Sequence, residues 1–83
     1  MAVTIVLEEE PYRLITDGDK HYAVIEARDG LVYSLDSHDR HEAPDTTDGM
    51  AAVVGDDWCG QSVAMERYQY MIQYEARYSQ VLW

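Results

Sequence analysis

Alternating apolar and polar positions over the first part of the chain predict a series of β-strands. The stretch "AVTIVLE" is rich in β-branched residues and ends at three glutamates and Pro11, whose missing N–H stops strand pairing. The apolar runs "YRLIT", "KHYAVIEAR" and "LVYSLD" follow, separated by "DGD" and "DG". Asp-Gly between such runs is typical of hairpin turns that need positive φ. The pattern predicts an antiparallel meander of four strands over residues 2–36.

A two-residue turn at Asp29 and Gly30 would fix the register of the last hairpin. The cross-strand pairs expected from it are Glu26 with Tyr33, Ile25 with Ser34, and Val24 with Leu35. Apolar side chains then occupy both faces of the sheet, so neither face is clearly polar. We therefore expect both faces to be covered.

The pattern changes after residue 36. Residues 36–49 combine Pro, Gly, Thr and carboxylates with hardly an apolar side chain, which favours a surface loop. "AAVV" at 51–54 predicts a short fifth strand, and residues 62–82 contain no Gly or Pro and follow a helical period. The expected fold class is α+β, with a four- or five-stranded antiparallel sheet followed by one long C-terminal helix packed on it. Residues 1–83 are expected to form a single domain.

The predicted helix has a wider apolar arc than packing on a sheet requires. Its apolar and aromatic residues cover roughly 200°, whereas a helix resting on a sheet needs little more than about 100°. Tyrosine combines apolar area with a hydroxyl that tolerates water, which favours it at protein interfaces. A small self-associating structural or adaptor module is therefore one interpretation, and a homodimer would suit it. The candidate self-association residues are Tyr22, Tyr33, Tyr70, Tyr74 and Val81.

Charge restricts the classes of partner. The 83 residues include 6 Lys plus Arg against 16 Asp plus Glu, a formal net charge of -10, while 47% of them are hydrophobic and 11% aromatic. Such a composition suffices for a packed fold. Nucleic acid and anionic lipid would both repel the chain, so we expect direct contact with neither. A lone cysteine and an N-terminus without a basic, apolar leader favour the cytoplasm.

Carboxylates recur with a regular spacing, at every third position from residue 36 to residue 48. Uniform negative charge costs folding stability through self-repulsion, so solubility alone does not explain so many acids. Carboxylates can imitate nucleic-acid phosphates and accept charge-assisted hydrogen bonds from Arg and Lys. The candidate partner-binding residues are Glu8, Glu9, Glu10, Asp36, Asp39, Glu42, Asp45, Asp48, Asp56 and Asp57.

The polar residues also contain the groups needed for two other chemistries. Cys59 lies just ahead of the predicted helix, and His38 or His41 could act as its base in a small cysteine-dependent enzyme. The same histidines with neighbouring carboxylates supply metal-ligand types, but their spacing fits no calcium loop, and no second pair of His or Cys completes a zinc site. The sequence therefore favours a non-enzymatic protein with no cofactor and no metal.

In size and composition the chain resembles, as a class, the small acidic inhibitors encoded by phages and mobile elements, notably anti-CRISPR proteins and other DNA mimics. The residues that carry the resemblance are the three glutamates at 8–10, the acid series from 36 to 48, and the pair at 56 and 57. The resemblance implies a stoichiometric binder, often dimeric, that acts inside a bacterial cell. Its implied partner is a basic nucleic-acid-binding protein or a subunit of a CRISPR effector.

Overall fold

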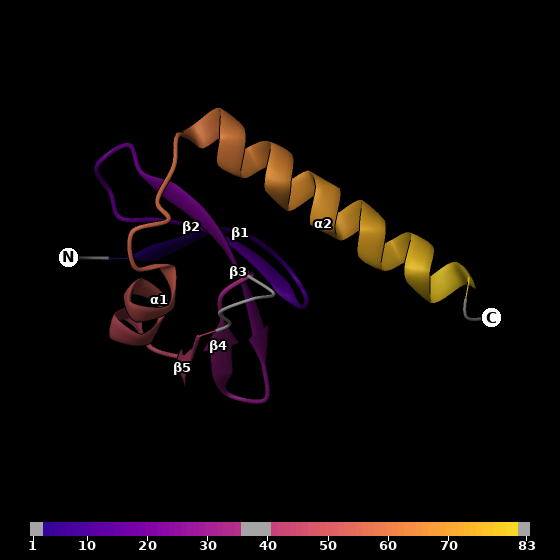
Figure 1. Cartoon of the computed structure of the whole chain (residues 1–83), viewed down its shortest axis with the longest axis horizontal. Coiled ribbons are helices and arrows are strands. Elements are labelled where there is room, and N and C mark those ends of the chain that lie inside the picture. Colours follow the sequence, from indigo (N-terminus) through magenta and orange to yellow (C-terminus); the bar gives the residue numbers. More distant parts are fainter. Residues whose placement is uncertain (1–2, 36–40, 82–83) are drawn as a thin grey trace.

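A five-stranded antiparallel sheet followed by a long C-terminal helix forms the body of the protein, which confirms the expected α+β class (Figure 1). The computed structural model describes residues 3–35 and 41–81, and the side-chain surroundings of the last helix as far as residue 74. The strands follow the order of the chain across the sheet. The elements are β1 (Thr4–Glu9), β2 (Tyr12–Thr16), β3 (Tyr22–Arg28), β4 (Leu31–Tyr33), β5 (Glu42–Pro44), α1 (Thr47–Val54) and α2 (Gln61–Val81).

The hairpin between β3 and β4 turns at Asp29 and Gly30, as predicted. Both have positive φ, 56° and 80°, and Glu26 pairs with Tyr33. The other two predicted pairs are wrong, because β4 ends at Tyr33 and the ladder stops there. At this point Ser34 donates its backbone N–H to the His41 carbonyl, and its Oγ accepts the His41 N–H, at 3.1 and 2.9 Å.

Residues 41–54 differ from the prediction of a loop and a short strand. The fifth strand is β5, at 42–44, and "AAVV" belongs to helix α1. Thr46 begins this helix, because its Oγ1 accepts the Gly49 N–H at 2.9 Å and so satisfies an otherwise unpaired donor. Met50, Val53 and Val54 then fall at helical spacing and are buried. The two valines suggested a strand only because the helical face begins one residue before "AAVV".

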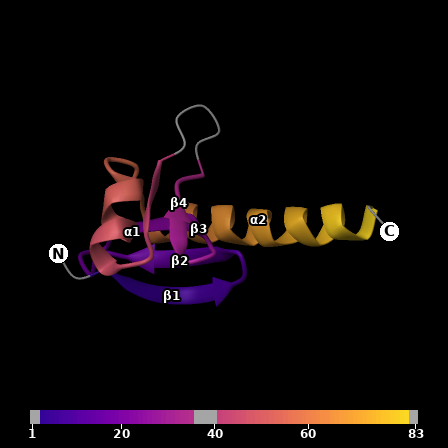
Figure 2. The same ribbon diagram turned by 90° about the horizontal axis from the view of Figure 1, so that it is seen from below.

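Each face of the sheet has its own hydrophobic core, so both faces are covered. On one face α1 packs on apolar side chains of β2, β3 and β4, with Ile15, Ile25 and Val32 fully buried. On the other face α2 packs on β2 and β3, where Ala64 and Tyr68 of the helix meet Leu14. Figures 1 and 2 show that the C-terminal part of α2 extends beyond the sheet.

Strand β1 forms one edge of the sheet, and all six of its residues are exposed. Ile5, Val6 and Leu7 each leave 43–44% of their surface accessible. The register shifts between Ile5 and Leu7, and the glutamates Glu8 and Glu9 follow. A bulge and charged side chains hinder the addition of another strand, so this apolar edge is poorly suited to pairing.

Candidate functional site

Arg13 holds two of the ten predicted partner-binding carboxylates. Its Nε donates to Glu8 Oε2 at 2.6 Å, while Nη1 and Nη2 donate to the two oxygens of Asp45 at 2.6 and 3.0 Å. The Arg13 side chain is only 12% exposed, so these contacts are partly shielded from water. The hydrogen bonds from Arg13 lower the pKa of the Asp45 carboxyl, and the bonds to Asp45 raise the pKa of Arg13. Glu8 and Asp45 therefore attach β1 and the start of α1 to β2.

Most of the other predicted carboxylates are on the surface. They are Glu9 in β1, Glu10 in the following turn, Glu42 in β5, Asp48 in the first turn of α1, and Asp56 and Asp57 just after α1, all exposed. Asp36 and Asp39 lie outside the described residues. The acids from 42 to 48 pass from a strand through a bend into a helix, so they do not form a row of one regular spacing.

Further acids are engaged locally. Asp17 accepts the Asp19 backbone N–H at 2.8 Å and contacts His21 Nδ1 at 3.1 Å, and these contacts, led by the Asp19 bond, lower its pKa. Glu26 accepts a hydrogen bond from Arg28. The pairs of Arg13 and Arg28 thus occupy two of the few basic residues, whereas six exposed carboxylates of the predicted set have no such basic partner in the described part of the chain.

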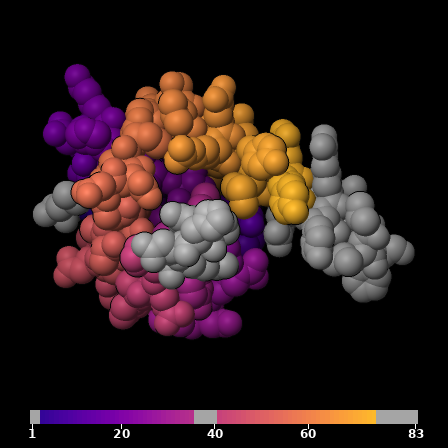
Figure 3. Space-filling view, viewed as in Figure 1, coloured from indigo at the N-terminus to yellow at the C-terminus, as the bar shows by residue number. Residues whose placement is uncertain are grey.

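The predicted tyrosine surface is divided between the core and the solvent. Tyr70 and Tyr74 are 64% and 52% exposed, and their rings stack with centroids 6.3 Å apart. Tyr22 and Tyr33 are half-buried in the sheet, and the side chain of Val81 lies outside the described surroundings. Figure 3 shows the side chains of α2, in orange, along one border of the molecule. The exposed part of the surface is therefore the stacked pair on α2.

Tyr68 belongs instead to the core beneath α2, where it is 7% exposed. Burial raises the pKa of its hydroxyl, and the nearby charges of Glu9 and Glu8 add to this effect. As far as Tyr74, the residues of α2 thus separate into a buried face against the sheet and an exposed aromatic face.

Cys59 is hydrogen-bonded to Tyr22 of β3 through both its backbone and its thiol. Its backbone exchanges two hydrogen bonds with Tyr22, at 2.7 and 2.9 Å, and its Sγ donates to the Tyr22 carbonyl at 3.3 Å. It is half-buried two residues before α2 begins. His41 lies just before β5, where its N–H bonds to Ser34, and His38 lies outside the described residues. The contacts of Cys59 fasten the segment before α2 to β3.

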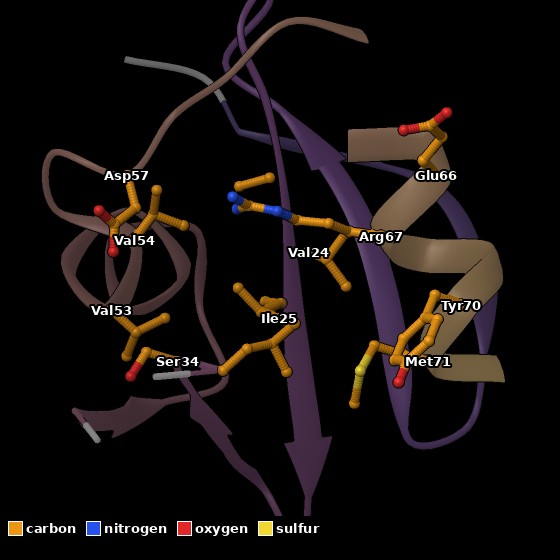
Figure 4. Close-up of a pocket in the computed structure, with 12 residues that line it drawn as sticks. Val24, Ile25, Ser34, Val53, Val54, Asp57, Glu66, Arg67, Tyr70 and Met71 are labelled. Carbon is orange, nitrogen blue, oxygen red and sulfur yellow. The ribbon is translucent and has the colours of Figure 1, made fainter. Parts of the chain in front are cut away.

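A cavity that the sequence did not predict lies between the two helices, beside β3 (Figure 4). Its volume is about 730 Å³, within the range of roughly 300–1,000 Å³ typical of ligand pockets. Apolar side chains form much of its wall, and three charged residues join them. The apolar residues include Val24, Leu35, Val53, Val54, Tyr70 and Met71, and the charged ones are Asp57, Glu66 and Arg67.

The cavity has a simple origin in the sheet. Because β4 ends at Tyr33, no strand covers the neighbouring edge of β3, and the space between α1 and α2 stays open there. The only available signal in the sequence was Ser34, a polar residue that interrupts the apolar alternation of "LVYSLD".

The described residues contain neither a metal-ligand cluster nor a membrane-spanning helix. In residues 3–35 and 41–81, as far as their side chains are described, no group of three or more His, Cys, Asp or Glu is arranged to hold a metal ion. No helix within these ranges has the length and apolar character needed to cross a bilayer. Comparisons with known protein families, curated proteins and solved structures found no match.

Proposed function

We propose that this protein is a non-enzymatic acidic binding protein that inhibits a nucleic-acid-handling complex in the bacterial cytoplasm. It would dock its carboxylates on the basic surface where that complex binds DNA or RNA, in the manner of a DNA mimic or an anti-CRISPR protein. The observation that carries the proposal is a surplus of exposed carboxylates, on a folded frame, without basic partners among the described residues.

The physical argument rests on the distribution of charge. A chain of net charge -10 destabilises its own compact state by repulsion, and a cationic partner would relieve that repulsion on binding. Arg and Lys of such a partner form charge-assisted, often bidentate, hydrogen bonds with carboxylates. The frame supplies rigidity, because Glu9 lies on a strand paired with β2, while Glu42 and Asp48 project from a strand and a helix whose other sides contact the core beneath α1.

Capture from a bacterial lysate tests the proposal. The immobilised protein is compared with a variant that carries Glu9→Gln, Glu10→Gln, Glu42→Gln and Asp56→Asn, four exposed acids without contacts that fix the fold. A control variant carries Gln69→Asn and Gln73→Asn at exposed positions of α2.

We expect the parent and the control to retain basic nucleic-acid-binding proteins that the acid variant loses. If the acid variant retains the same proteins as the parent, the carboxylates are not the docking groups.

The exposed aromatic face of α2 favours a second function, a small self-associating module. Tyr70 and Tyr74 place two stacked rings in water, on a helix that extends beyond the sheet (Figure 1). A second copy that packs on these rings would bury them. Because two copies of charge -10 repel each other, salt should strengthen this association, whereas salt should weaken docking on a cationic partner.

Sedimentation velocity over a micromolar dilution series, at low and high salt, tests the self-associating module. We expect Tyr70→Ser with Tyr74→Ser to yield a monomer, and Gln69→Asn with Gln73→Asn to leave the association unchanged. A parent protein that is monomeric at every concentration and salt would remove this second function.

A further inference from the structure

One stretch of β3 has an open backbone edge. The ladder on this side contains the pair of Glu26 with Tyr33 and, beyond a gap, the bridge of Tyr22 with Cys59. Val24 lies between them. Even-numbered residues of β3 direct their N–H and C=O groups to this side, as the hydrogen bonds of Tyr22 show, because alternate residues of a strand bond to opposite neighbours.

Val24 therefore presents one N–H and one C=O to the cavity, with no ladder partner among the described residues. The residue is buried, at 9% exposure. Buried backbone groups in folded proteins are almost always hydrogen-bonded, so an open pair of this kind favours a ligand that supplies both a donor and an acceptor. One residue of a polypeptide supplies both.

The length of the gap restricts the ligand further. Hydrogen-bonded pairs close it at both ends, one at Glu26 and one at Tyr22, so only one residue can pair with Val24. A long added strand would meet β4 or the segment at Cys59. A chain end fits this space better than a continuous strand does.

The walls of the cavity suit an apolar side chain. Val53 and Val54 of α1 line one side, and Tyr70 and Met71 of α2 line the other (Figure 4). The space lies between the two hydrophobic cores, so a side chain placed there would be removed from water on both sides. Burial of a Leu- or Phe-sized side chain there would favour binding.

Arg67 provides a charge for the end of such a chain. Figure 4 shows its side chain directed from α2 across β3, while the carboxylate of Glu66 points away. Arg67 has no ion pair or hydrogen bond to another described residue, although the chain is strongly acidic. Asp57 on the α1 side would oppose an anion, so Arg67 is the group that could favour one.

We propose that this cavity binds the C-terminal residue of a polypeptide with an apolar last side chain. The terminal residue exchanges hydrogen bonds with Val24, its side chain enters the space between α1 and α2, and its carboxylate bonds to Arg67. This site is independent of the carboxylate surface, and it would give the protein a second kind of protein ligand.

Titration followed by ¹⁵N NMR tests the site. The probes are four acetylated tripeptides, acetyl-Ala-Ala followed by Leu, Val, Phe or Met, each prepared as the free acid and as the C-terminal amide. We expect at least one free acid to shift the Val24 amide resonance to saturation, and its amide to bind roughly tenfold more weakly, because a charge-assisted hydrogen bond is lost. A copy methylated on its last backbone nitrogen should also bind roughly tenfold more weakly.

Two variants of equal charge change complete the experiment. Arg67→Gln should remove the difference between acid and amide, whereas Lys20→Gln, at an exposed turn, should preserve it. The proposal is overturned if none of the four acids shifts Val24 saturably, if acids and amides bind alike, or if Arg67→Gln preserves their difference. None of these results bears on the lysate capture, so the two proposals fail separately.

Discussion

Replacement of Arg13 by Met should destabilise the fold, because it removes the hydrogen bonds that Arg13 donates to Glu8 and Asp45. Arg13 donates one hydrogen bond to Glu8 and a bidentate pair to Asp45. Its side chain is 12% exposed. A fully buried pair loses about 3–5 kcal/mol when one partner is removed. The carboxylates here are 40% and 32% exposed, so water can solvate them after the change. We therefore expect a loss of about 2 kcal/mol in the free energy of unfolding.

Urea unfolding followed by far-UV circular dichroism measures this loss. In a domain of this size about 2 kcal/mol corresponds to a fall in Tm of roughly 8–16 °C. The control is Arg28→Met, which removes the pair with Glu26. Arg28 is 50% exposed, so its loss should cost less than about 1 kcal/mol.

The loss of stability caused by Arg13→Met should also depend on pH. Arg13 lowers the pKa of Asp45 below the ordinary value of 3.8. A carboxyl whose pKa is depressed on folding contributes stability above its unfolded pKa and loses it as the pH falls through the folded pKa. The difference between parent and Arg13→Met should be complete at pH 7, should begin to shrink as the pH falls to 3.8, and should be lost once the pH has passed below the lowered pKa of Asp45. Equal losses for the two Arg variants, or a difference that does not shrink as the pH falls below 3.8, would refute the reasoning.

Further predictions concern the turn into α1 and the single thiol. Gly49→Ala should cost more than about 3 kcal/mol, because its Cβ would stand 1.9 Å from the Pro44 carbonyl oxygen; Gly60→Ala, with no atom within 4 Å, is the control and should be nearly neutral, as thermal unfolding can show. Cys59→Ser should lower stability by no more than about 1.5 kcal/mol, since a hydroxyl can replace the thiol bond to the Tyr22 carbonyl. The thiol should react with iodoacetamide no faster than free cysteine, and a markedly faster reaction would favour the enzyme hypothesis instead.

The sheet could be predicted because its signals are local. Asp29 and Gly30 adopt the positive φ that an Asp-Gly turn requires, and this turn alone sets the pairing of Glu26 with Tyr33. Helix α1 was missed because its signals are spread over different kinds of residue. Thr46 caps it, and its apolar face begins at Met50, so "AAVV" read by itself resembles a strand.

The candidate sites were predicted less completely, because they depend on tertiary contacts. The regular spacing of acids does not persist in space, since Asp45 turns back to Arg13 while Asp48 begins a helix. Nothing local in the sequence reveals that Arg13, on another strand, is the partner. The cavity beside Val24 depends on where the pairing of β4 with β3 ends, at Tyr33.

We propose that this protein occupies the place of nucleic acid on a cationic partner. The most direct measurement takes a partner captured by the parent protein and compares its binding to this protein with and without the DNA or RNA that the partner binds. We expect preloaded nucleic acid to prevent binding, and the affinity of the free partner to fall steeply as salt rises. A ternary complex of unchanged affinity, insensitive to salt, would contradict the claim.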